Sequence, residues 1–390
     1  MSQYLIIGNG VAGTTAAEYI RKQDKEGEIT IVTDEDLPFY YRVRLNDFIS
    51  GDISETQLLA KKESWYEERN INLRLKTRIV DVNSQEKMAV TEDNQGFSYD
   101  RLLMATGSHS FVPPIKGSER KGVFALRNIQ DARNILAYAK NVEEIVLIGG
   151  GLLGLEAGHA LLKLGKRIRV VEFFPRLLPR QLDVEGARRL QKIMEDMGFS
   201  FRLGAKTEEI TGERQVSGVQ LEGGESLSAG MVIVSAGVRP NMALAQPLGL
   251  NTDKGIVVDD HLRTNQPDIY AAGDVSEFQG VPYGIWPAAM EQGKIAGSNM
   301  AGSDIQYDGT TMANSLKVAG IDLASAGNID AENEFESRVV TDENVYKKVV
   351  IKDNQIIGCI MLGETEGFSR ITQMMAEKQD ASQIEDIFPG

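Results

Sequence analysis

The sequence predicts an α/β protein with two doubly wound parallel sheets and a small α+β module at the C-terminal end. The first observation is a glycine-rich turn between an apolar strand and a helix, which occurs twice, at 8–13 and at 149–154. The second is that another apolar strand follows each turn, so that strand, turn, helix and strand fit within about 30 residues, as in a parallel βαβ unit. The third is a change of pattern near residue 310, after which no such turn recurs.

The individual elements follow from hydrophobic periodicity. The first βαβ unit has strands at 3–8 and 28–34 around a helix at 13–22, and the second has strands at 144–149 and 167–172. Three further strands are predicted at 72–76, 99–106 and 231–237, and two further helices at 129–140 and 183–198. Prolines make "FVPPIKG" (111–117) a linker. The C-terminal module has a strand-like segment at 315–327, a hairpin at 346–363 turning at Asp353–Asn354, and a helix at 369–378.

Composition excludes several classes of function. The net charge of −14 argues against nucleic acid as a general partner, because binding phosphates requires a basic surface. The start "MSQYLIIG" lacks the basic lead of a signal peptide, and no uncharged apolar run of about 18 residues predicts a membrane span, so we expect a cytoplasmic protein. Cys359 is the single cysteine, and the three histidines are scattered, so neither a disulfide nor a metal site is expected.

The first glycine turn predicts a dinucleotide site. Gly8 permits the tight turn, Gly10 lets the backbone approach a diphosphate, and Gly13 lets the helix lie close to the strand. The N–H groups at the start of the helix then face the anion, and Val11 and Ala12, inside the turn, are expected to belong to the same cofactor site. An acid after the next strand, Asp34 or its neighbour Glu35, is expected to bind a ribose hydroxyl. The alternative is a glycine turn without a ligand.

The second turn repeats the pattern with Gly149, Gly151 and Gly154 and with the helical residues Leu152 and Leu153. Glu172 ends the following strand, and a carboxylate there accepts both ribose hydroxyls of NADH but repels the additional phosphate of NADPH. Arg176 lies near enough to weaken that preference. Two such units indicate two dinucleotides, of which one is a resident flavin and the other a visiting NADH.

Three further segments resemble a known family. "LLMATGS" (102–108), "SAGVRPN" (235–241) and "DIYAAGDV" (268–275) are similar to motifs of the pyridine nucleotide–disulfide reductase superfamily, in the same order. The resemblance implies that Ala105, Thr106 and Gly107 lie beside FAD, that Gly237 belongs to the segment returning from the NADH domain, and that Gly273 and Asp274 hold the flavin phosphate and ribityl chain. It also implies a discontinuous FAD domain (1–112 and 242–308), an NADH domain (113–241) and a C-terminal α+β domain (309–390).

The segment "LPFYYRVRLNDFI" (37–49) indicates the branch of this superfamily. It has no cysteine, unlike the disulfide reductases and related peroxidases, and it resembles the corresponding segment of ferredoxin- and rubredoxin-type reductases. That likeness implies that Arg42 binds the FAD diphosphate, that Asn46 lies near the flavin and that the Ile79 backbone contacts adenine. Trp286 either stacks near the flavin or serves packing alone. The C-terminal segment is similar to NADH:rubredoxin oxidoreductases and to the flavin-bearing part of NADH-dependent nitrite reductases.

The chain departs from this branch at two positions. Ferredoxin-type reductases usually pair a lysine near the flavin with the glutamate that follows the second turn; here Glu156 is present, but Asp47 occupies the lysine position. Val43 replaces the usual proline. Glu156 is therefore expected to position the nicotinamide either alone or with a different partner.

The expected function is hydride transfer from NADH to FAD N5, followed by electron transfer to a small iron protein such as rubredoxin or ferredoxin, without a redox disulfide. The alternatives are the flavin subunit of a larger reductase, a redox-sensing flavoprotein and an NADH oxidase. The segment 163–192 has nine basic and three acidic residues, which either steer an acidic partner or form a solvated helix face, whereas residues 304–390 have seven basic and sixteen acidic residues. Cys359, in an apolar hairpin, is expected to be a buried, inert thiol.

Overall fold

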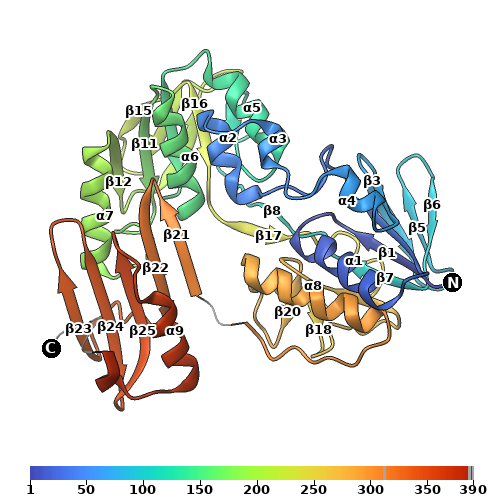
Figure 1. Ribbon diagram of the computed structural model, residues 1–390. Helices are drawn as coiled ribbons and strands as arrows, with labels where there is room; N and C mark the ends of the chain where they lie inside the picture. The colour runs from blue at the N-terminus through green and yellow to red at the C-terminus, as the bar shows by residue number, and fades with distance from the viewer. Residues whose placement is uncertain (311–312, 385–387, 389–390) are drawn as a thin grey trace. The chain divides into compact units, whose positions relative to one another are not determined.

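The computed structural model describes residues 1–310, 313–384 and 388. The chain forms two compact units (Figure 1). Unit 1 comprises Met1–Arg42, Ser54–His109 and Val238–Thr310, and unit 2 comprises Val43–Ile53, Ser110–Gly237 and Thr311–Gly390. The chain passes between the units along β8 (Ser108–Ser110) and β17 (Val238–Pro240), which pair with each other. The three-domain division expected from the sequence stays a prediction.

Unit 1 is built on a five-stranded parallel sheet in the order β19-β7-β1-β2-β3. These strands are, in that order, Ile269–Ala271, Arg101–Met104, Gln3–Ile7, Glu28–Val32 and Ile71–Arg74. Smaller elements complete the unit: η1 (Arg42–Arg44, extending past the unit boundary), α3 (Glu55–Leu58), α4 (Glu63–Glu67), β4 (Ile79–Asn83), β5 (Met88–Thr91), β6 (Gly96–Ser98), β18 (Ile256–Val258) and β20 (Ser276–Phe278).

Two helices of unit 1, α1 (Val11–Gln23) and α8 (Trp286–Met300), pack closely against each other (Figure 1). Glycines make this approach possible, since a Cβ at Gly293 or Gly297 would lie 2.4 Å from the carbonyl oxygens of Ala12 or Ala16. The close packing holds the N-terminal end of α1 against the sheet, directly after the first glycine turn.

Unit 2 repeats the arrangement with a parallel sheet in the order β12-β11-β10-β16-β9. These strands are Phe199–Leu203, Arg167–Glu172, Glu144–Ile148, Met231–Val234 and Val123–Phe124. The other elements are α5 (Ile129–Ala139), α6 (Leu152–Lys163), α7 (Val184–Asp196), β13 (Thr207–Thr211), β14 (Gly218–Leu221) and β15 (Ser226–Ser228). In both sheets the strand before the glycine turn is central, with the next two strands on one side of it and a later strand on the other. The predicted duplication is therefore confirmed.

A short piece of the N-terminal third of the chain also belongs to unit 2. Helix α2 (Leu45–Ser50) packs against α5 and α6, although the residues on both sides of 43–53 belong to unit 1. Helix α2 therefore brings Asn46 and Asp47 to the helix that contains Glu156.

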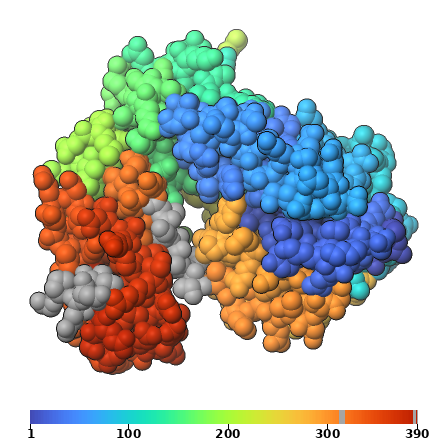
Figure 2. Space-filling model, in the orientation of Figure 1, coloured from blue at the N-terminus to red at the C-terminus, as the bar shows by residue number. Residues whose placement is uncertain are grey.

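The C-terminal module is an antiparallel sheet in the order β21-β22-β25-β24-β23, with α9 (Phe368–Glu377) and η2 (Ala381–Ile384). Its strands are Ala313–Val318, Ile321–Gly327, Gln355–Leu362, Tyr346–Lys352 and Glu336–Thr341. The predicted turn at Asp353–Asn354 is confirmed, since both residues have positive φ and Lys352 pairs with Gln355. Figure 2 shows this module, in orange and red, beside the green part of unit 2, in agreement with the contacts of α6 with β21 and of α7 with β25.

Among the described helices, none has both the length and the apolar character that crossing a bilayer requires. The predicted cytoplasmic location stays a prediction.

Candidate active site

The first glycine turn has the shape that a bound diphosphate requires. Gly8 has φ +115°, and a Cβ there would lie 2.1 Å from the carbonyl oxygen of Ala105. A Cβ at Gly13 would lie 2.0 Å from the Gly8 oxygen, whereas a Cβ at Gly10 would meet no heavy atom within 4 Å. Helix α1 begins at Val11, and no side chain caps it. The outer two glycines therefore close the turn, and the middle one leaves open space beside uncapped helical N–H groups.

The second turn has the same division of roles. A Cβ at Gly149 (φ +111°) would lie 2.3 Å from the Ser235 oxygen, and a Cβ at Gly154 would lie 2.8 Å from the Gly149 oxygen. Gly151 again has nothing within 4 Å, and helix α6 starts uncapped at Leu152. The alternative of a glycine turn that serves only the fold does not explain why, in both turns, the middle glycine lines open space.

The first turn contains a residue that sequence reasoning missed. The Asn9 side chain is 8% exposed, and its Oδ1 accepts hydrogen bonds from the Thr14 hydroxyl (3.1 Å) and the Tyr66 hydroxyl (3.0 Å). Its Nδ2 has no partner. Because buried amide donors are normally satisfied, this orphaned donor fits a bound acceptor such as FAD. The signal in the sequence was a polar residue between two glycines of the turn.

The two acids that follow β2 have different environments. Asp34 is exposed, whereas Glu35 is partly buried and accepts hydrogen bonds from the Tyr40 hydroxyl and the Arg42 guanidinium. The Glu35 carboxylate is therefore the one whose position is fixed, and Arg42 is held beside it. The ribose and diphosphate contacts of these residues stay predictions.

Glu172 is held at the carboxyl end of β11, next to the second turn. Its side chain is buried, one carboxylate oxygen accepts the N–H of Gly150, and the other accepts the N–H of Phe174 at 2.8 Å. Each oxygen retains a second lone pair, so the fixed carboxylate can still accept a ribose hydroxyl.

The two segments that connect the units, near Thr106 and near Asn241, are hydrogen-bonded to each other within unit 1. The Thr106 hydroxyl donates to the Asn241 carbonyl (2.9 Å), and Asn241 Nδ2 donates to the Thr106 carbonyl (2.7 Å). Asp274 follows Gly273 (φ +83°) and accepts the Ser108 hydroxyl at 2.8 Å. The hydrogen bond to Ser108 fixes the side chain that is expected to hold the ribityl chain.

Trp286, at the start of α8, lies against two aromatic rings of the 37–49 segment. Its ring is stacked with Phe39 (centroids 5.8 Å apart) and with Tyr41 (5.7 Å). These contacts support the packing alternative, and a flavin contact stays a prediction.

The surroundings of Glu156 differ from the lysine pairing of ferredoxin-type reductases. Glu156 is partly buried on α6, and its Oε1 accepts the backbone N–H of Ala319 at 2.9 Å. Burial raises the pKa of Glu156, the Ala319 N–H opposes the rise, and the Asp47 carboxylate adds to it. Asn46, on the same helix as Asp47, is 8% exposed and its Oδ1 has no partner. A backbone donor and a nearby carboxylate thus surround Glu156, and an unsatisfied amide lies on the adjacent helix.

The predicted site residues divide between the units. Unit 1 contains Gly8, Gly10, Val11, Ala12, Gly13, Asp34, Glu35, Arg42, Ile79, Ala105, Thr106, Gly107, Gly273, Asp274 and Trp286, and unit 2 contains Asn46, Gly149, Gly151, Leu152, Leu153, Gly154, Glu156, Glu172 and Gly237. Asn46, expected with the flavin residues, is thus on the unit that contains the second turn.

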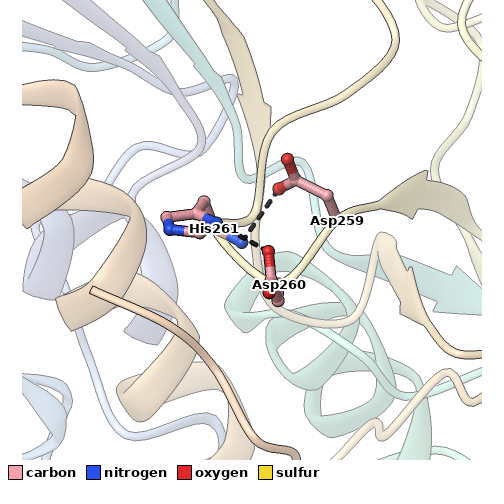
Figure 3. Close-up of side chains that lie close together, drawn as sticks. All are labelled: Asp259, Asp260 and His261. Carbon is pink, nitrogen blue, oxygen red and sulfur yellow. Dashed lines mark hydrogen bonds and ion pairs between the residues drawn. The ribbon is translucent and has the colours of Figure 1, made fainter. Parts of the chain in front are cut away.

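Three other side chains lie close together in unit 1, Asp259, Asp260 and His261 (Figure 3). Asp259 closes a turn by accepting the backbone N–H groups of His261 and Arg263. His261 Nδ1 is 2.6 Å from Asp260, and its Nε2 is 3.0 Å from Asp304. Both ring nitrogens already face carboxylates, so we assign no metal to this cluster.

Cys359 lies in β25 with 0% exposure, and burial raises the pKa of its thiol to about 12. At neutral pH it is a thiol rather than a thiolate, the form that reacts. The expectation of a buried thiol is confirmed.

Comparison with known proteins identifies the family. Residues 2–293 match the model of the pyridine nucleotide-disulphide oxidoreductases, and residues 313–379 match the C-terminal domain of rubredoxin NAD+ reductase. The chain belongs to the pyridine nucleotide-disulphide oxidoreductase family. The match to a pyridine-nucleotide oxidoreductase family agrees with the two cofactors that the glycine turns predict, FAD and NADH.

Two relatives and one solved structure show the range of the similarity. A nitrite reductase [NAD(P)H] of Bacillus subtilis is 37% identical over 99% of this chain and 48% of its own length. An NADH-rubredoxin oxidoreductase of Clostridium acetobutylicum is 30% identical over 99% of this chain and 97% of its own. The crystal structure of NADH:rubredoxin oxidoreductase from Clostridium acetobutylicum superposes with a TM-score of 0.83, at 28% identity, over 97% and 96% of the two chains. The chain thus spans about half the length of the nitrite reductase.

Proposed function

We propose that the protein oxidises NADH at FAD and passes the electrons to a small iron protein such as rubredoxin or ferredoxin, without a redox disulfide. The observation behind this proposal is the position of Cys359: the only thiol is fully buried in the C-terminal sheet, so the electrons have no sulfur relay. The full-length match to an NADH-rubredoxin oxidoreductase supports the same acceptor class.

The flavin supplies a hydride acceptor that can release single electrons. The residues of unit 1 would hold it: the α1 N-terminus and Arg42 at the diphosphate, Glu35 at the ribose and Asp274 at the ribityl chain. We assign residues 1–112 and 242–308 to this FAD domain, 113–241 to the NADH domain and 309–390 to the C-terminal domain.

NADH would bind on the second turn. The uncapped α6 N-terminus would accept its diphosphate, Glu172 its ribose, and Glu156 would orient the nicotinamide. Because orientation of the reactants supplies much of the rate in such transfers, the chain contributes mainly by fixing these groups.

A second function is favoured by the 37% identity to half of a nitrite reductase. In that case the chain would be the flavin-bearing part of a larger reductase, and its natural acceptor would be another component of that reductase rather than rubredoxin.

Anaerobic stopped-flow mixing distinguishes a reductase of a small iron protein from the flavin-bearing part of a larger reductase. Excess NADH should bleach the flavin, and reduced rubredoxin should then form at least about tenfold faster than air reoxidises the flavin, a difference of about 1.4 kcal/mol in the barrier. The Cys359→Ala variant is the control, and it should bleach and reoxidise at the wild-type rates. Slow reoxidation by both rubredoxin and air favours the second function, and failure to bleach contradicts both.

Glu172→Gln should weaken NADH binding. The buried carboxylate accepts two backbone N–H groups, and the amide replaces one acceptor by a donor, so we expect a KM for NADH raised roughly tenfold, as for loss of one charge-assisted hydrogen bond of about 1.5 kcal/mol. The KM for NADPH should change less, so the preference for NADH over NADPH should become smaller. Glu143→Gln, at an exposed acid that pairs with Arg167, is the matched control. An unchanged preference would show that Glu172 does not bind the ribose.

The basic segment 163–192 is largely neutralised by neighbouring acids. Five of its nine basic residues form ion pairs within unit 2: Lys163 with Asp52, Arg167 and Arg169 with Glu144, and Arg188 and Arg189 with Glu185. These pairs favour the solvated-face alternative.

A further inference from the structure

Glu156, expected to orient the nicotinamide, has a partner far away in the sequence. Its carboxylate accepts the N–H of Ala319, 163 residues later, at the turn of the β21–β22 hairpin. Val318 pairs with Ile321, so Ala319 and Gly320 form a two-residue turn, with φ of +54° and +84°. A non-glycine residue at positive φ is uncommon, and such strain is typical of positions that the surrounding structure fixes for a purpose.

The first residue of the turn is also buried beside α6, whereas Gly320 is exposed. Ala319 is 2% exposed, and a Cβ on Gly320 would lie 3.9 Å from Cε1 of His159, one helical turn after Glu156. Figure 1 shows β21 and β22 running up to α6. The hydrogen bond is therefore part of a packed contact.

The rest of the C-terminal module is anchored to the same part of unit 2. The Tyr346 hydroxyl and Lys348 Nζ both contact Asp183 Oδ2, at 2.6 Å and 3.2 Å, and Arg189 donates to the carbonyls of Asp342 and Val345. Asp183 is the residue that caps α7. The hairpin turn is thus held from a second point, on the other strands of its sheet.

We propose that the Ala319–Gly320 turn is the positioning element of Glu156, which holds its carboxylate through a backbone N–H where related reductases use a lysine. This inference rests on the proposed role of Glu156 in orienting the nicotinamide. It assigns the C-terminal module a part in NADH oxidation: the module fixes the orienting carboxylate and favours its ionised form.

The charge balance around Glu156 explains why a donor is needed. Burial and the Asp47 carboxylate both raise the pKa of Glu156. The Ala319 N–H and, to a smaller extent, the Lys163 ammonium group lower it because both stabilise the ionised form. Other charged or titratable groups also lie near this site. Around α2 and α6, Arg44 pairs with Asp47 and Lys163 pairs with Asp52, and His159 lies beside this second pair. On the hairpin, Lys317 and Asp322 pair with each other. Without the N–H, the pKa of Glu156 should rise further.

Two variants remove the N–H from Glu156 in the full-length holoprotein. Ala319→Pro deletes the donor, and insertion of two glycines between Val318 and Ala319 lengthens the turn without changing its residues. The matched control is Ala319→Gly, which retains the N–H and tolerates positive φ. Thermal unfolding identifies any variant that no longer folds, and the insertion variant serves if the proline variant does not.

The first measurement is the pKa of Glu156, from infrared spectra of the carboxyl band across pH without NADH, assigned by its loss in Glu156→Gln. We expect a higher pKa in both disrupting variants and no change in Ala319→Gly. An unchanged pKa in a folded disrupting variant would overturn the inference, whatever the protein reduces.

The second measurement is flavin reduction by NADH across pH. In the disrupting variants, we expect the rate at saturating NADH to fall about tenfold, and the acid limb of the profile to move to higher pH. A shifted pKa with an unchanged reduction rate would support the contact but contradict the role of Glu156 in the proposed function. The two failures are therefore distinguishable.

Discussion

Gly10→Val should give a colourless protein, and Gly151→Val a yellow one that NADH barely reduces. The two glycines occupy equivalent positions as residues before α1 and α6, both have extended backbones, and neither has a heavy atom within 4 Å of its Cβ position. Because valine adopts extended backbone readily and meets nothing there, both variants should fold. Each branched side chain then fills the space that a diphosphate requires.

The expected effect of Gly151→Val is a KM for NADH raised on the order of a hundredfold, or about 2.8 kcal/mol of binding energy. Absorbance of bound flavin and steady-state kinetics measure the two effects, and each variant is the control for the other, since the FAD content of Gly151→Val should equal that of the wild type. Wild-type kinetics in Gly151→Val would contradict the assignment of the second turn.

Asp183→Ala should destabilise the protein strongly. Lys348 is 1% exposed, and its ammonium group contacts Asp183 Oδ2 (3.2 Å), the Asp330 carbonyl (3.0 Å) and Asn333 Oδ1 (3.1 Å). Removing the carboxylate takes away the nearer of two counter-ions, since Asp330 Oδ2 lies 4.0 Å from the same ammonium group. Breaking a buried pair costs up to about 3–5 kcal/mol. The substitution also deletes the α7 cap, where Asp183 accepts the N–H of Gly186 at 2.9 Å, at about 1 kcal/mol.

Urea unfolding, followed by circular dichroism, measures this loss. Arg188→Ala is the control, because Arg188 forms an exposed ion pair with Glu185 on the same helix and such pairs contribute about 0–1 kcal/mol. Replacing both Asp183 and Lys348 by apolar residues should recover part of the stability, because the buried ammonium group is removed together with its nearer counter-ion, while Asp330 retains the N–H groups of Glu334 and Phe335. An Asp183→Ala protein as stable as the Arg188→Ala protein would show that water reaches Lys348.

The sequence predicted the duplicated sheets well because their signals are local. A glycine turn, the strand before it and the helix after it lie within a short window, so hydrophobic periodicity and turn chemistry are enough to place Gly8–Gly13 and Gly149–Gly154. The Asp353–Asn354 turn was predictable for the same reason, since those residue types favour positive φ.

The contacts of Glu156 and Lys348 were beyond such reasoning because their partners are distant in the chain. The strand "YKKVVIK" gives no sign that Lys348 is buried, since its nearest counter-ion, Asp183, lies 165 residues earlier and its other partners, Asp330 and Asn333, lie outside the strand. The sequence also identified Asp47 without revealing that 43–53 joins unit 2. Asn9 is different: it lay within a recognised motif, and only its unsatisfied Nδ2 distinguishes it.

Because Cys359 is buried, its thiol can report local opening of the native C-terminal sheet. The thiol lies in β25, within the buried cluster of side chains that includes those of α9, so a maleimide cannot reach it in the closed native state. The labelling rate therefore measures how often the C-terminal sheet opens around this one sulfur, with no engineered probe and no second thiol.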